Sequence, residues 1–103
     1  MDKRRETRIQ MRDVLFNKYI DGHPYAAELV DLSLHGMLVR TIREPNLSRD
    51  SYSVELGIKG TNFRIWLWAR KVWEFGNRQA LRFEATNAAD QIRLQNLLSR
   101  AAA

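Results

Sequence analysis

Hydrophobic and polar residues alternate along much of the chain, which is the pattern of β-strands with one buried face. The clearest run, 63–69, places Phe63, Ile65, Leu67 and Ala69 on one side and Arg64, Trp66 and Trp68 on the other. Turn signals such as Asp21-Gly22-His23-Pro24 and Gly76-Asn77 separate the runs. The other β-rich runs cover 14–16, 25–32, 37–42, 52–58, 70–75 and 80–83. The pattern therefore predicts six or seven short strands.

The pattern changes near the C-terminus. Apolar residues there recur at helical spacing, at Ile92, Leu94, Leu97 and Leu98, which predicts a helix over residues 87–103. Many short strands favour closure into a barrel, because closure removes exposed strand edges. We therefore expect an all-β fold, a small six- or seven-stranded antiparallel β-barrel over residues 13–86 with a C-terminal α-helix. Residues 1–12 are polar and arginine-rich and are expected to form a flexible arm.

Length and composition agree with one small domain. The 103 residues are 45% hydrophobic and 28% charged, which is ordinary globular usage. The absence of cysteine removes disulfides and suits a reducing compartment. No run approaches the roughly 20 apolar residues of a membrane span, and no apolar segment of a secretory signal follows the first charged residues. We therefore expect a cytoplasmic protein.

The charge is unbalanced toward arginine. Lys and Arg number 17 against 12 Asp and Glu, and arginine supplies 13 of the 17. A guanidinium is a planar fork that pairs with phosphate or a guanine edge and stacks on flat rings. An anionic partner with a planar part fits this usage, although arginine on an ordinary soluble surface is an equal alternative. The arm contains Lys3, Arg4, Arg5, Arg8 and Arg12.

Two short motifs follow one another along the chain. Arg4-Arg5-Glu6-Thr7-Arg8 has the form RxxxR, and Asp31-Leu32-Ser33-Leu34-His35-Gly36 has the form DxSxxG. Neither is specific alone, but in this order, spacing and β-rich setting the pair resembles the PilZ domain family in its stand-alone, single-domain type. Ala69-Arg70-Lys71-Val72-Trp73, with Gly76 and Ala80-Leu81-Arg82-Phe83, is similar to that family's closing strand pair. The resemblance covers nearly the whole chain and implies a PilZ-like split barrel.

The resemblance also implies a ligand, cyclic di-GMP, which carries two phosphodiester charges and two guanines. In the family the two motif arginines clamp this ligand, and here that role falls on Arg4 and Arg8, with Arg5 as a helper on phosphate. Arginine suits the task because it can bind phosphate, a guanine edge or the face of the ring. Arg8-Ile9-Gln10-Met11-Arg12 is a second RxxxR. We prefer the first register, because a pair of arginines leads it and a strand follows soon after.

The DxSxxG segment supplies the complementary groups. The Asp31 carboxylate can accept hydrogen bonds from the N1 and N2 donors of guanine. Ser33 can donate or accept toward guanine or a ribose phosphate, and Gly36 would let the backbone turn and approach closely. Leu32 is expected to point into the barrel. For Asp31 and Ser33 the alternative is simple capping of a turn by short polar side chains.

On this interpretation the protein is a receptor or adaptor that changes conformation on binding cyclic di-GMP and regulates a partner protein. Trp66 and Trp68 either lie under the C-terminal helix or form an exposed surface for that partner. Aromatic and basic residues on a small barrel also suit single-stranded nucleic acid, which is the alternative function. Either one ligand or a stacked pair can be accommodated, with Lys3 within reach of a second phosphate.

Neither catalysis nor metal binding is predicted. The sequence has no Gly-x-Ser-x-Gly elbow, no P-loop and no paired histidines at helical spacing. His23 and His35 have no third ligand at metal spacing. We therefore expect no enzyme, no metal site and no cofactor beyond the nucleotide ligand.

Overall fold

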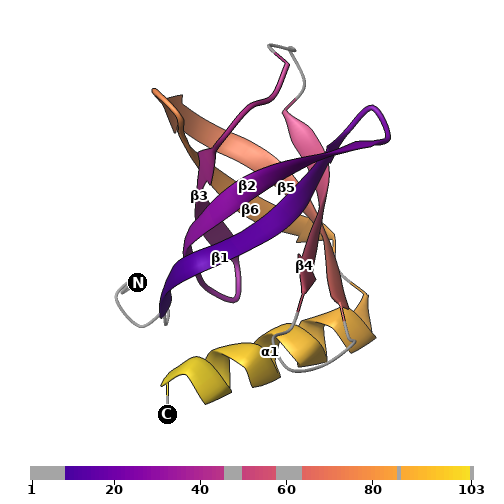
Figure 1. The fold of residues 1–103 in the computed structure, drawn as a ribbon. Coiled ribbons are helices and arrows are strands. Elements are labelled where there is room, and N and C mark those ends of the chain that lie inside the picture. Colours follow the sequence, from indigo (N-terminus) through magenta and orange to yellow (C-terminus); the bar gives the residue numbers. More distant parts are fainter. Residues whose placement is uncertain (1–8, 46–49, 58–63, 86, 103) are drawn as a thin grey trace.

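Six antiparallel strands and one helix make up the fold in the computed structural model, which describes residues 9–45, 50–57, 64–85 and 87–102. The strands form a closed barrel in the order β1-β2-β3-β6-β5-β4, and the helix lies across one end of it (Figure 1). The prediction of a small antiparallel barrel with a C-terminal helix is confirmed. The elements are β1 (Ile9–Ile20), β2 (His23–Leu32), β3 (Gly36–Thr41), β4 (Ser51–Gly57), β5 (Arg64–Phe75), β6 (Arg78–Ala85) and α1 (Ala88–Ala102).

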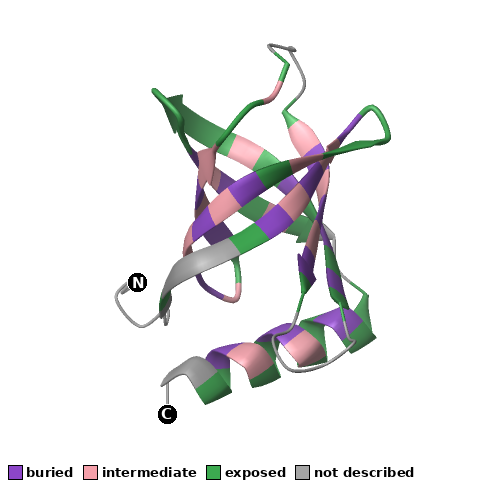
Figure 2. Cartoon of the chain, in the orientation of Figure 1, coloured by how far each residue is buried: buried purple, intermediate pink, exposed green. Residues whose placement is uncertain are grey.

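Alternating side chains fill the barrel. In β5, Ile65, Leu67 and Ala69 are buried, while Trp66 and Trp68 between them are exposed. Buried and exposed positions alternate visibly along the strands in Figure 2. The inward residues of all six strands join one core, and its apolar strand residues are Phe16, Ile20, Ala27, Leu29, Leu32, Met37, Val39, Tyr52, Val54, Leu56, Ile65, Leu67, Ala69 and Leu81.

A two-residue turn joins β1 to β2. Asp21 and Gly22 both have positive φ, 52° and 82°, which is the requirement of a type I′ hairpin turn, whose twist matches that of paired strands. Ile20 therefore pairs directly with His23, and Tyr19 with Pro24. The sequence placed His23 and Pro24 in the turn, and this was wrong. Proline is tolerated there because it lies near the first residue of the strand.

The first strand begins earlier than expected. Residues 9–12 were assigned to the arm, but β1 starts at Ile9 and pairs with β2 through Ile9↔Leu32 and Gln10↔Asp31. The pairing is irregular between Gln10 and Val14, so this part of the strand lacks the regular alternation by which strands are recognised. The barrel therefore starts at residue 9 and not at residue 13. Residues 1–8 lie outside the described part of the chain.

The helix closes one end of the barrel. Its first turn is capped by Asn87, whose Oδ1 accepts a hydrogen bond from the Asp90 N–H at 2.8 Å. Leu94 and Leu98 are buried in the barrel core, whereas Ile92 of the same predicted periodic set is exposed. Asp90 also accepts a bond from the Trp66 N–H at 3.3 Å, which ties the helix to β5. In the described ranges, no helix combines the length and apolarity needed to cross a membrane.

Candidate functional site

The segment between β2 and β3 is a tight bend held by Ser33. Its N–H donates to the Gly36 carbonyl at 2.9 Å, and its hydroxyl donates to the same carbonyl at 3.2 Å. The hydroxyl also accepts from the N–H groups of Gly36 at 3.2 Å and His35 at 3.4 Å. Since a hydroxyl offers one donor and two lone pairs, these three bonds of the hydroxyl use its donor and both of its lone pairs. Ser33 is fully buried and fixes the shape of the bend, as in the capping alternative.

Asp31 lies on the strand just before this bend, next to an irregularity. The register of β2 with β3 shifts between Leu29 and Asp31. Simple alternation would put Asp31 on the same buried face of β2 as Leu29. The bulge instead turns Leu32 into the core and leaves Asp31 half-buried. The inward position expected for Leu32 is confirmed. Asp31 is paired with Gln10 of β1 on one side and Leu38 of β3 on the other.

Gly36 packs against the neighbouring strand β6. A Cβ atom on Gly36 would lie 2.5 Å from the backbone oxygen of Leu81, which is far inside van der Waals contact. Gly36 pairs with Arg82, and the His35 carbonyl accepts a bond from the Phe83 N–H at 2.8 Å. The close approach expected of this glycine is therefore present, but its neighbour is the β6 backbone.

The arginines of the arm complete the predicted site. Arg4, Arg5 and Arg8 lie outside the described residues, as does Lys3. The structure thus brings together Asp31, Ser33 and Gly36 on one bend, and it places the start of β1 beside them. Arg12, of the alternative RxxxR register, falls inside β1.

Trp66 and Trp68 are uncovered on the outside of β5. They are 44% and 43% exposed, and α1 uses Leu94 and Leu98 to pack against the barrel core instead. The Tyr19 ring lies 5.5 Å from the Trp66 ring. With Ser51 and Ser53 these rings line a shallow groove of about 440 Å³. Of the two arrangements considered for these tryptophans, the exposed one is present.

A second polar cluster lies at the other end of β3, and it was not predicted from the sequence. Lys18 of β1 is fully buried, and its Nζ donates to Glu44 at 2.9 Å and to Gln79 at 2.5 Å. The same ammonium lies 3.9 Å from the centre of the Tyr52 ring. Burial lowers the pKa of Lys18, and the hydrogen bond that its ammonium donates to Glu44 opposes that shift. The sequence did contain one sign of this burial. Lys18 lies two residues from both Phe16 and Ile20, on the inward face of an alternating strand.

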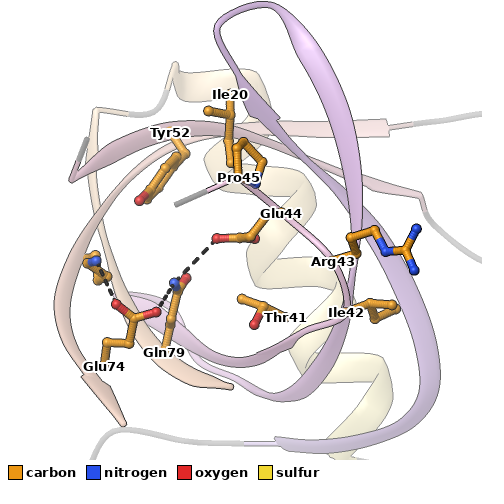
Figure 3. Close-up of a pocket in the computed structure, with 10 residues that line it drawn as sticks. Ile20, Thr41, Ile42, Arg43, Glu44, Pro45, Tyr52, Glu74 and Gln79 are labelled. Atoms are coloured by element: carbon orange, nitrogen blue, oxygen red, sulfur yellow. Dashed lines mark hydrogen bonds and ion pairs between the residues drawn. The ribbon is translucent and has the colours of Figure 1, made fainter. Parts of the chain in front are cut away.

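This cluster borders a cavity of about 330 Å³ at the barrel mouth (Figure 3). Gln79 donates from its amide to Glu74 at 2.9 Å and to Glu44 at 3.4 Å, and Glu74 pairs with Lys71 at 2.9 Å. The hydrogen bonds from Gln79 and Lys71 lower the pKa of Glu74. The mouth is thus lined by charged groups that pair with one another, and the second oxygen of Glu44, Oε2, is buried without a hydrogen-bond partner among the described residues. Within the described ranges, no group of three or more His, Asp or Glu residues is arranged to hold a metal ion.

The geometry defines a class of protein: a small closed barrel with a helix across one end and a DxSxxG bend beside the start of its first strand. The model of the PilZ domain family matches residues 2–100. The chain therefore belongs to the PilZ domain family, and the resemblance read from its motifs is confirmed.

Solved structures agree with this fold. The PilZ domain of CeSA from a cellulose-synthesizing bacterium is 18% identical with a TM-score of 0.73, over 94% of this chain and 99% of that one. The PilZ domain of YcgR from Escherichia coli, described with c-di-GMP, is 21% identical with a TM-score of 0.71, over 98% and 92% of the two chains. The Bacillus subtilis inhibitor of motility MotI is 16% identical with a TM-score of 0.71, over 99% of this chain and 52% of MotI. A search of curated proteins found no match.

Proposed function

We propose that this chain is a receptor for cyclic di-GMP that passes the signal to a protein partner. One observation carries the proposal. The strand that follows the arginine-rich segment starts directly beside the bend, since Ile9 pairs with Leu32 and Gln10 with Asp31. Family membership supports the same ligand, because the related YcgR domain is described with c-di-GMP.

Covalent geometry allows both motif arginines to reach the bend. Arg8 is bonded to Ile9, and consecutive Cα atoms are about 3.8 Å apart. Arg4 lies four residues further, and four residues extend at most roughly 14 Å. Arg4 and Arg8 both precede Ile9 in the sequence, whereas Arg12 belongs to β1. This favours Arg4 and Arg8 as the clamp, with Arg5 on phosphate.

The bend supplies the other half of the site. Half-buried Asp31 is held between two strands, so its carboxylate is positioned in advance for the N1 and N2 donors of guanine. Because the Ser33 hydroxyl already bonds the backbone of Gly36 and His35, we assign Ser33 chiefly to shaping the bend. Direct contact of Ser33 with the ligand stays a prediction. The proposal gives no residue a catalytic role.

Calorimetry with cyclic di-GMP tests the assignment. Asp31→Ala and Arg8→Ala should each weaken binding at least tenfold, because each removes a charged hydrogen-bond partner. Asp50→Ala and Arg78→Ala are matched controls, since both residues are exposed and lie away from the bend; they should bind like the wild type. Unchanged affinity in both Asp31→Ala and Arg8→Ala would refute the site.

The exposed tryptophans suit two further roles, and binding experiments can distinguish these roles. As a partner surface, Trp66 and Trp68 should matter for regulation and leave cyclic di-GMP affinity unchanged. In the alternative, single-stranded nucleic acid stacks on these rings, and Arg64 beside them adds positive charge, although Glu55 pairs with it at 3.2 Å. Oligonucleotide binding with a steep salt dependence that Trp66→Ala and Trp68→Ala abolish, and Asp31→Ala does not, would favour the alternative.

A further inference from the structure

An arginine of β6 lies beside the bend on the outer surface. Arg82 pairs with Gly36 of β3 on one side and with Arg70 of β5 on the other. Residues directly opposite each other on antiparallel strands share a face. The next residue inward, Leu81, is buried, and Arg82 is exposed. Gly36 places no side chain between Arg82 and the bend, because its backbone packs directly against the Leu81 carbonyl of β6.

Arg82 has no partner of its own in the described part of the chain. The neighbouring Arg70 pairs with Glu84 at 2.9 Å, whereas no hydrogen bond or ion pair of the described residues involves the Arg82 side chain. Like charges directly opposite on adjacent strands are unfavourable, and Glu84 neutralises only Arg70. An anion bound near Gly36 would remove this repulsion.

The separation also suits a nucleotide. Asp31 pairs with Leu38, and Leu38 pairs with Ala80, two residues before Arg82 on the same face of β6. Asp31 and Arg82 are thus separated by two strand spacings across β3 and by two residues along β6, which together make roughly 12 Å. A guanine nucleotide held at Asp31 can therefore carry its phosphate toward Arg82.

We propose that Arg82 binds a phosphate group of the cyclic dinucleotide, from the β6 side of the bend. This inference rests on the proposed function and extends its site to β6. A phosphate is the fitting group, because the guanidinium donates charge-assisted hydrogen bonds and the bend side already offers Asp31 for the base. Arg82 would hold the ligand on the outer face of the barrel.

Calorimetric titration of the full chain with cyclic di-GMP tests the inference. Arg82→Gln should weaken binding about tenfold, and Arg82→Lys, which keeps the positive charge, should stay within about threefold of the wild type. Arg78→Gln is the matched control: Arg78 is an exposed arginine on the same face of β6, roughly 13 Å further along the strand. It should bind like the wild type.

The outcomes separate the two hypotheses. If the wild type binds and Asp31→Ala weakens binding but Arg82→Gln does not, the role of Arg82 is overturned and the proposed function stands. If Arg82→Lys loses as much affinity as Arg82→Gln, a phosphate contact is overturned. If the wild type does not bind cyclic di-GMP at all, the proposed function itself fails. Unchanged melting temperatures of both Arg82 variants would show that the affinity change is not a folding defect.

Discussion

The two ends of β3 hold their polar groups in different ways. At its start, the bend bonds mainly to itself and to the β6 backbone, and charged side chains such as Arg82 stand exposed around it. At its end, Lys18 is buried and bonds to Glu44 and Gln79. The buried Lys18 charge at the mouth is thus held by an ion pair and hydrogen bonds within the barrel, whereas the charge of Arg82 beside the bend is exposed. We therefore expect the mouth to serve stability, and we propose that the bend serves binding.

The largest expected effect is Gly36→Ala. The added methyl group would meet the backbone oxygen of Leu81 at 2.5 Å. The backbone of β6 cannot move away from this methyl group without opening the pairing of β3 with β6. We expect the free energy of unfolding to fall by about 3 kcal/mol, measured by urea denaturation. Gly57→Ala is the control, because its Cβ would meet only the flexible end of Arg64 at 3.4 Å. Equal losses in the two variants would show that the bend does not depend on this close approach.

Glu44→Gln should have the next largest effect. It replaces the carboxylate that faces the buried Lys18 ammonium with a neutral amide, so that this ammonium keeps only neutral contacts such as Gln79 and the Tyr52 ring. We expect a loss of about 2 kcal/mol in the free energy of unfolding, less than for a wholly enclosed pair because Glu44 keeps some exposure. Glu28→Gln, which breaks the exposed pair with Arg40, should cost about 0.5 kcal/mol or less. Comparable losses would mean that the buried Lys18–Glu44 pair contributes no more to stability than the pair of Glu28 with Arg40.

The smallest effect concerns pH. Hydrogen bonds from Gln79 and Lys71 lower the pKa of Glu74 below its ordinary value of 4.5. The unfolded chain then binds the proton at higher pH than the folded chain, so this stabilisation is present above pH 4.5 and is lost as pH falls through the folded-state pKa. Since Glu74 is partly exposed, we expect about 0.5 kcal/mol. Denaturation of the wild type and Glu74→Gln should differ at pH 7 and converge in acid; a constant difference would contradict this.

The pattern of hydrophobic and polar residues was sufficient to predict the barrel strands and the helix. A strand or helix that buries one face repeats its hydrophobic residues at a regular spacing, which can be recognised in the sequence. Trp66 and Trp68 of β5, and Leu94 and Leu98 of α1, lie on the faces that this period indicates. The predictions from the sequence were wrong where the pairing of two strands departs from regular alternation. At Ile9 and Asp31 an irregular register hides the strand or changes its face.

The candidate site was predicted less completely. Asp31, Ser33 and Gly36 were found by their motif, and their shared bend follows from their closeness in the chain. Lys18, Glu44 and Gln79 come from three separate segments, and nothing local to each residue indicates the others. Arg82 was missed for the same reason, because its place beside Gly36 depends on the pairing of β3 with β6.

The central claim is that the bend and the arginine-rich segment together select a guanine dinucleotide. Calorimetric titration of the wild-type chain with cyclic di-GMP and, in parallel, with cyclic di-AMP tests it most directly. Asp31 should favour guanine, because adenine lacks the paired N1 and N2 donors. We expect cyclic di-GMP to bind at least about tenfold more tightly. Equal affinity for the two ligands, or no binding of cyclic di-GMP, would contradict the account.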